Sequence, residues 1–326
     1  MVNDNDPTQG TPPTNADMEL SADTMGEVKR ISYAGLICRR FFRSRSALVG
    51  LAIFAALVLL ALFGPLICRF DYAEPDFTAI GLPPGPEHWF GTDGGGFDLF
   101  ACVVHGLGRS LIIGVSYSVL TTVIAALVGV GIAYARGWVE RVGMWIIDML
   151  MVIPSFLLVA LFVRSASGQD GWLALIFGLT LFGWIGYART LRTMTLSLRE
   201  RDYVRAAKYM GVSPLAIIVR HLIPNLGSIL IIDTVLGVIG GINSETAFSF
   251  LGLGIKLPDT SLGYLLSQAS SVMITMPWML VFPSVALIVL CVSMQLIGDG
   301  LRDAFDPYSR AAGSAEPAEI EEEAEL

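Results

Sequence analysis

The stretch SLIIGVSYSVLTTVIAALVGVGIAYA, residues 110–135, decides the fold of this chain, because its 26 residues include no charged side chain. A helix of this length extends ~39 Å, which exceeds the ~30 Å hydrocarbon core of a bilayer. Backbone N–H and C=O groups must be hydrogen-bonded internally in lipid, so an open strand is excluded. The stretch therefore predicts a transmembrane helix.

Further apolar stretches on both sides of this one have the length of a membrane span. They cover residues 47–68, 142–163, 172–188, 226–250 and 278–298. The composition agrees, because 54% of the 326 residues are apolar and 15% are charged, against ~25% charged in an ordinary soluble domain. The sequence predicts an all-α membrane protein with six transmembrane helices.

The basic residues predict the orientation of these helices. Cytoplasmic loops of membrane proteins are enriched in Lys and Arg. If the N-terminus is cytoplasmic, 17 of the 21 Lys and Arg residues fall on the cytoplasmic side. Both termini and the loop 189–225 are then cytoplasmic, and the segments 69–109 and 251–277 are external. Residues 262–276 form either a short helix at the outer mouth or a re-entrant plug.

Acidic residues are concentrated in the two tails. Six of the 29 Asp and Glu residues lie in residues 1–28 and six in residues 316–326. The pattern predicts disordered cytoplasmic tails over 1–28 and 308–326, an N-terminal region over 29–109 with the first span and external loop, and a core over 110–307 with five spans. Because no clustered basic face accompanies these acids, nucleic acid is not an expected partner.

The cytoplasmic loop carries a predicted helical hairpin. A helix begins at Asp202, Gly211 fits its C-cap, and Ser213 with Pro214 fits the start of a second helix that reaches about His221 before Pro224 stops it. A small surface at Ala206 and Ala207 suits close approach by a partner protein. A helix lying on lipid headgroups and a DNA-binding helix-turn-helix are the alternatives. The candidate coupling residues are Tyr203, Arg205, Ala206, Ala207, Lys208, Gly211, Ser213, Pro214, His221 and Pro224.

The segment AAKYMGVSPLAIIVRHLIPN, residues 206–225, resembles the "EAA" loop of binding-protein-dependent ABC-transporter permeases, in the peptide-permease branch. In that family the loop is a coupling helix that sits in a groove of the cytoplasmic ATPase. Arg205 occupies the position of the family's Glu.

Other segments are similar to DppC/OppC-type subunits in the same order along residues 30–310. They are the external HWFGTD at 88–93 with Asp98, the DML at 148–150 with IPS at 153–155, the segment from Glu245 through FSFLGLG at 248–254, and GDGLRD at 298–303 with Asp306-Pro307. The resemblance implies a type I ABC importer permease (MetI-like) fold in the cytoplasmic (inner) membrane. It also implies transport of dipeptides or oligopeptides.

The resemblance also implies partners for this chain. These are a homologous second permease, two cytoplasmic ATPase subunits, an extracytoplasmic solute-binding protein and membrane lipid. The chain itself is expected to bind no cofactor, since ATP and Mg belong to the ATPases. It lacks a GxxxxGK[ST] loop and the HExxH and GxSxG motifs, so a non-catalytic subunit with no metal site is expected.

Three acidic residues lie within predicted spans: Asp148, Asp233 and Glu245. Intramembrane charges usually face the bundle interior or a wet cavity. They are candidates for a translocation pathway, and the alternative is interhelical hydrogen bonding that fixes packing. An ion-driven secondary carrier that uses these acids is the second functional hypothesis.

Small and sulfur-containing residues suggest further packing features. Gly129 and Gly131 are expected to allow close helix packing. Cys68 and Cys102 are expected on the same external side, where a disulfide between them is one alternative and free thiols the other.

Overall fold

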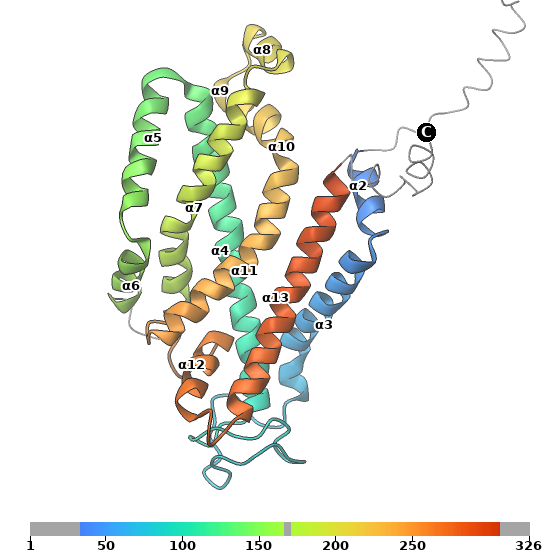
Figure 1. Cartoon of the computed structure of the whole chain (residues 1–326), viewed down its shortest axis with the longest axis vertical. Helices are drawn as coiled ribbons and strands as arrows, with labels where there is room; N and C mark the ends of the chain where they lie inside the picture. The colour runs from blue at the N-terminus through green and yellow to red at the C-terminus, as the bar shows by residue number, and fades with distance from the viewer. Residues whose placement is uncertain (1–32, 166–170, 307–326) are drawn as a thin grey trace, which may run out of the picture.

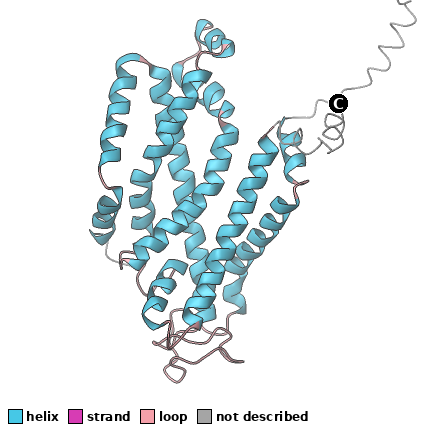
Figure 2. Cartoon of the chain, in the orientation of Figure 1, coloured by secondary structure: helices cyan, strands magenta, loops and turns pink. Residues whose placement is uncertain are grey.

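The computed structural model describes residues 33–165 and 171–306. The predicted acidic tails, 1–28 and 308–326, lie outside the described residues. The described part is a bundle of long helices with short helices and loops at its two ends, and it contains no β-strand (Figures 1 and 2). The elements are α2 (Tyr33–Phe41), α3 (Arg45–Ile67), α4 (Leu99–Ala135), α5 (Gly137–Val152), α6 (Ser155–Ser165), α7 (Gly171–Leu198), α8 (Asp202–Tyr209), α9 (Pro214–Ile217), the π-helix η1 (Ile218–Leu222), α10 (Ile223–Asn225), α11 (Gly227–Phe250), α12 (Leu262–Val272) and α13 (Trp278–Phe305).

Within the described ranges, five helices are long and apolar enough to cross a membrane: α3, α4, α7, α11 and α13. The pair α5 and α6 passes the same test together, and would make a sixth span, but it bends by 74°. The predicted third span over 142–163 is therefore two helices that meet at Pro154, a residue type that can kink a helix. Ile153 before Pro154 adopts extended backbone with φ −75° and ψ 127°, because a proline ring disfavours the helical conformation of the preceding residue.

Two predicted loop boundaries also differ from the structure. Helix α4 starts at Leu99 instead of 110, because Asp98 caps it by accepting a hydrogen bond from the Ala101 amide at 2.8 Å. The external loop is therefore shorter than the predicted 69–109. Helix α7 continues to Leu198, so residues 189–198 of the predicted cytoplasmic loop are helical.

The long helix α4 lies inside the bundle, against α7 and α11 (Figure 1). Its Gly129 meets the backbone of α7 so closely that a Cβ atom there would lie 3.0 Å from Ala188 Cα. A Cβ at Gly131 would meet nothing within 4 Å. The expectation of close packing is thus confirmed for Gly129 and wrong for Gly131.

Helix α3, the first span, packs on α13 through small residues. A Cβ at Gly50 would lie 2.6 Å from Leu296 Cβ, and Ala47 of α3 is fully buried beside Gly300 of α13. Without bulky side chains at the contact, the two helices approach closely, as is common in membranes. Pro283 lies inside α13, which remains one helix.

The two ends of the bundle carry different structures. The hairpin α8–α10, helix α2 and the C-terminal end of α13 lie at one end, shown at the top of Figure 1. The loop 68–98 and the α12 region lie at the opposite end. This division matches the two sides assigned from the basic residues, and the first group is called the hairpin end below.

Candidate functional site

The hairpin of α8 to α10 has the predicted caps. Gly211 has φ +78°, a conformation that glycine adopts without a steric penalty. The Val212 amide donates to the Ala207 carbonyl at 3.1 Å, which ends α8. Ser213 Oγ accepts a hydrogen bond from the Ala216 amide at 3.4 Å, and Pro214 follows at the first helical position. The tight turn between two short helices is confirmed.

Pro224 does not stop the second helix, contrary to the sequence prediction. The chain passes from α9 through the π-helix η1 and α10 into α11, and Pro224 lies within α10. The Ile223 amide donates to the Ile218 carbonyl, five residues back. A π-turn is a wider turn than an α-turn, and this one brings the chain to Pro224 without ending the helical path.

The inner face of the hairpin is packed onto the bundle. Val204, Ala207, Ile217 and Leu222 are at most 3% exposed and join a core cluster with residues of α4 and α7. Ala206 is exposed but Ala207 is buried within the chain, so the pair does not form the small exposed surface that was predicted. The hairpin is thereby fixed to the helices beneath it.

The remaining candidate coupling residues are mostly at the surface. His221 is half-buried, and its carbonyl accepts a hydrogen bond from Asn225 Nδ2. The exposed ones are Tyr203, Arg205, Lys208, Gly211, Ser213, Pro214 and Pro224.

Three large apolar side chains at the tip of the hairpin were not predicted. Tyr209 is 90% exposed, Met210 75% and Leu215 68%. They flank the Gly211 turn and are called the apolar tip below. The sequence shows these residues as apolar positions in an otherwise polar loop. Whether they are exposed depends on which face of α8 packs against the bundle, and the sequence does not show this. Clustered exposed apolar side chains mark interaction surfaces.

Ion pairs connect the hairpin to the ends of the long helices. Glu200, between α7 and α8, pairs with Arg136, Arg199 and Arg205. Glu140 of α5 pairs with Arg192 of α7 and with Arg199, the residue after the end of α7. Arg205, which occupies the family's Glu position, is therefore paired within the chain, with Nη2 3.3 Å from Glu200 Oε2.

The three intramembrane acids are not gathered at one place. Asp148 of α5 is half-exposed and pairs with Arg189 Nη1 of α7 at 3.1 Å. Asp233 is half-buried on α11. Glu245 lies twelve residues further along the same helix, or ~18 Å at 1.5 Å per residue. The interhelical contact expected as the alternative is present for Asp148 and Glu245.

Glu245 joins three helices. Its side chain is fully buried, and its carboxylate accepts hydrogen bonds from Ser249 Oγ at 2.8 Å, Ser261 Oγ at 2.6 Å and Ser110 Oγ at 3.5 Å. Ser261 is the N-cap of α12, and Ser110 Oγ accepts a hydrogen bond from the Leu262 amide. A carboxylate at a helix N-terminus is favoured by the helix dipole. Glu245 therefore fixes α12 to α4 and α11.

At the end opposite the hairpin, Asp259 holds a second polar cluster. His105 Nε2 lies 2.9 Å from Asp259 Oδ1, and Arg109 Nε lies 2.8 Å from Oδ2. Burial raises the pKa of Asp259, but the His105 hydrogen bond and the Arg109 charge outweigh it, so the pKa lies below its ordinary value. Tyr72 stacks on the His105 ring with centroids 3.7 Å apart. This cluster ties the loop before α12 to α4.

The external motif around His88 is a folding element of the loop 68–98. His88 Nδ1 lies 2.8 Å from Asp98 Oδ2, and both side chains are buried. Asp98 is also the N-cap of α4, so the pair holds the loop against the start of that helix. Cys68 and Cys102 are free thiols in this structure, the second of the two alternatives. Among the described residues, no group of three His, Cys, Asp or Glu side chains is arranged to hold a metal ion.

The comparisons with known proteins agree with this architecture. Residues 109–310 match the family model for the binding-protein-dependent transport system inner membrane component. Residues 32–84 match the model for the N-terminal TM domain of oligopeptide transport permease C.

Several curated relatives cover most of the chain. The oligopeptide transport system permease protein OppC of Mycobacterium tuberculosis H37Rv is 44% identical over 276 residues, which is 85% of this chain and 95% of the relative. The protein of the same name from Bacillus subtilis 168 is 34% identical, over 90% of this chain and 97% of the relative. A putative peptide permease protein of Brucella suis is 37% identical, over 82% of this chain and 89% of the relative.

Among solved structures, a chain of the MetNI methionine ABC transporter in an inward-facing conformation shares 20% identity with a TM-score of 0.47, over 63% of this chain and 97% of that chain. The family is shown by the sequence matches, which span both the N-terminal span and the core. The chain belongs to the family of binding-protein-dependent transport system inner membrane components, with the MetI-like permease fold.

Proposed function

We propose that this chain is the permease subunit of an ATP-driven importer of dipeptides or oligopeptides, with both termini in the cytoplasm. Two cytoplasmic ATPases bind ATP and Mg and drive the transport. A solute-binding protein delivers the substrate from outside. The names of the relatives support the substrate class, and the asymmetry of basic residues supports the orientation.

The apolar tip is the observation that carries the coupling role. Tyr209, Met210 and Leu215 are exposed at the end of a hairpin whose other face is buried in the bundle. An exposed apolar surface on a short helix suits insertion into a groove of another protein. The hairpin is capped and packed, so a displacement of its tip is passed to α4, α7 and α11.

A second permease has a suitable surface along α4. Five exposed apolar residues follow one stripe of this helix: Ile112, Val115, Val119, Val123 and Leu127. A groove of about 500 Å³ lies beside this stripe, lined by α4 and by α10 with α11. A transport path formed between two such chains would pass along this surface. A path between two chains also explains why a bundle of so few spans suffices.

The ion-driven carrier has less support. Asp148, Asp233 and Glu245 lie apart, and Glu245 is enclosed by serine hydroxyls. A proton or ion pathway needs such groups in sequence along a wet cavity. ATP dependence of uptake into vesicles distinguishes the two functions, since an ion gradient alone would drive the carrier.

The coupling role can be tested by replacing two residues of the apolar tip with charged ones. The variant Met210→Asp with Leu215→Asp is expected to insert normally but to lose co-purification with the ATPases and substrate uptake, because charged side chains resist burial in an apolar groove. The matched control is Phe77→Asp, an exposed apolar residue in the external loop. Normal uptake and ATPase co-purification by the tip variant would contradict the proposal.

A further inference from the structure

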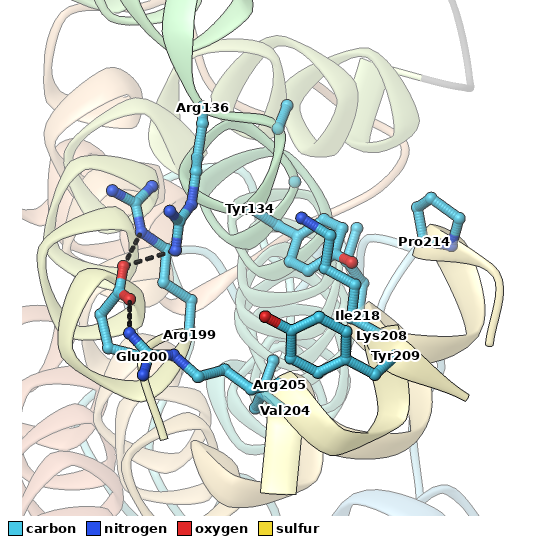
Figure 3. A pocket seen from close by; sticks show the side chains of 12 residues that line it. Tyr134, Arg136, Arg199, Glu200, Val204, Arg205, Lys208, Tyr209, Pro214 and Ile218 are labelled. Carbon is cyan, nitrogen blue, oxygen red and sulfur yellow. Dashed lines mark hydrogen bonds and ion pairs between the residues drawn. The ribbon is translucent and has the colours of Figure 1, made fainter. Parts of the chain in front are cut away.

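A cavity of about 780 Å³ lies beneath the hairpin, where the end of α4, the α7–α8 connection, α8 and α9 meet (Figure 3). Its volume is within the ~300–1,000 Å³ typical of small-molecule sites. Its polar lining comes from the end of α4, the α7–α8 connection and α8. The lining residues used below are Tyr134, Arg136, Arg199, Glu200, Arg205, Lys208 and Tyr209.

The charges around this cavity are unbalanced. Arg136, Arg199, Arg205 and Lys208 line it, with Glu200 as the acid among the lining residues. Counting Glu140 and its second partner Arg192 adds one charge of each sign and leaves the excess at three positive charges. One carboxylate thus serves three arginines, and the cluster attracts an anion.

The cations lie on two sides of the cavity. Figure 3 shows the guanidinium groups of Arg136, Arg199 and Arg205 around the Glu200 carboxylate on one side, with Lys208, Tyr134 and Tyr209 opposite them. Within the described ranges, Lys208 has no acidic side chain at ion-pair distance. Guanidinium groups bind phosphate oxygens in a bidentate manner, and lysine binds them as a point charge.

The remaining lining is apolar, from Gly131, Ala135, Val204, Pro214 and Ile218. The cavity therefore combines several cations and two phenol groups with an apolar wall at the end of the membrane-spanning helices. This combination suits a phosphate group, which is found both on anionic phospholipids and in free phosphates.

We propose that the cavity beneath the hairpin binds a phosphate-bearing ligand through Arg205 and Lys208, with Arg136 and Arg199 as supporting cations. The ligand then bridges α8 to the ends of α4 and α7. It neutralises the cations that would otherwise repel one another. The proposal concerns binding to this chain alone and holds whether or not the chain is driven by ATPases.

The test measures thermal stability of the purified full chain in two arms. In one, the chain is placed in nanodiscs of phosphatidylcholine with or without phosphatidylglycerol. In the other, inorganic phosphate or pyrophosphate is titrated onto the chain in detergent, with chloride at equal ionic strength as reference. We expect an increase in melting temperature in at least one arm, and the responding arm identifies the source of the phosphate.

Two variants assign the effect to the cavity. Arg205→Gln with Lys208→Gln is expected to weaken the apparent affinity about tenfold, since two charged hydrogen-bond donors are lost. Lys208→Arg is expected to retain it. The control Arg220→Gln removes an exposed cation of the same hairpin that does not line the cavity.

Several results would overturn the proposal. One is that neither arm stabilises the wild type. Another is that the double variant is stabilised as much as the wild type. A third is that Arg220→Gln loses as much of the stabilisation as the double variant does. Both Arg205 and Lys208 are exposed, so their replacement is not expected to unfold the chain. Size-exclusion profiles of the variants check this directly. Transport is not part of the measurement, so a failure here is separate from a failure of the coupling role.

Discussion

At the scale of single residues, Glu245 is the position where we expect a substitution to lower the free energy of unfolding most. It is the one fully buried acid among the described residues, and its partners come from three helices. A buried carboxylate is tolerated when hydrogen bonds replace its water. Here the serine hydroxyls provide those bonds, and the position close to the first turn of α12 adds a favourable dipole.

We predict that Glu245→Ala lowers the free energy of unfolding by about 3 kcal/mol, because buried hydroxyl groups lose their acceptor and a cavity remains. Glu245→Gln keeps one acceptor oxygen and is expected to cost about 1 kcal/mol. Asn243→Ala, at an exposed position of the same helix, is the control and should stay within about 0.5 kcal/mol. Denaturant titration in detergent measures all three. Equal stability of Glu245→Ala and wild type would contradict the structural role.

At the scale of elements, α4 and α7 approach each other closely at a glycine. The backbones meet at Gly129 and Ala188, and the obstacle to a Cβ at residue 129 is backbone, which cannot move aside as a flexible side chain does. Gly131, two residues later on the same helix, faces open space. The two positions therefore form a matched pair.

We predict opposite effects of the same substitution at these positions. Gly129→Ala is expected to destabilise the chain by about 1–3 kcal/mol, through overpacking of a close contact. Gly131→Ala is expected to be neutral or to stabilise by up to about 1 kcal/mol, since alanine favours a helix over glycine. Thermal unfolding of both variants beside wild type checks this. A larger loss at residue 131 than at residue 129 would show that the helices are packed differently.

Local chemistry explains which elements could be predicted from the sequence. The caps at Gly211 and Ser213 were predicted correctly, because each depends on the residue itself and its near neighbours. Pro154 could be recognised as a site where the span can kink, but the size of the bend could not be predicted, and the continuation past Pro224 was missed. A proline permits a break, a kink or a π-turn, and tertiary packing selects among them.

The orientation of side chains on the hairpin was less predictable. Ala207 is buried while Met210 is exposed, although both are residue types often found buried, and Tyr209 is exposed as well. Which face of α8 packs inward depends on Val204 and on its contact with the distant α4–α7 cluster. The partners of Asp259 likewise depend on residues that are far apart in the sequence.

At the scale of the whole molecule, the described chain has a hairpin end with many cations and an opposite end with enclosed loops. The buried pair His88–Asp98 and the partly buried pair Asp259–Arg109 hold the loops of the opposite end against α4. The ion pairs of Glu140 hold α5 against the end of α7, and Glu200 links Arg136, after α4, to Arg205 of the hairpin. Since α4 runs between the two ends, a displacement of the hairpin acts on a helix that reaches the other side.

The proposed coupling requires that the apolar tip faces the cytoplasm, where an ATPase reaches it. The most direct measurement labels single cysteines with a membrane-impermeant maleimide, in a chain whose native Cys38, Cys68, Cys102 and Cys291 are replaced. We predict that Met210→Cys is unreactive in sealed spheroplasts and reactive in inverted vesicles, and that Phe77→Cys of the external loop shows the reverse. Labelling of Met210→Cys from outside sealed spheroplasts would contradict the account, because the hairpin would then lie on the wrong side of the membrane.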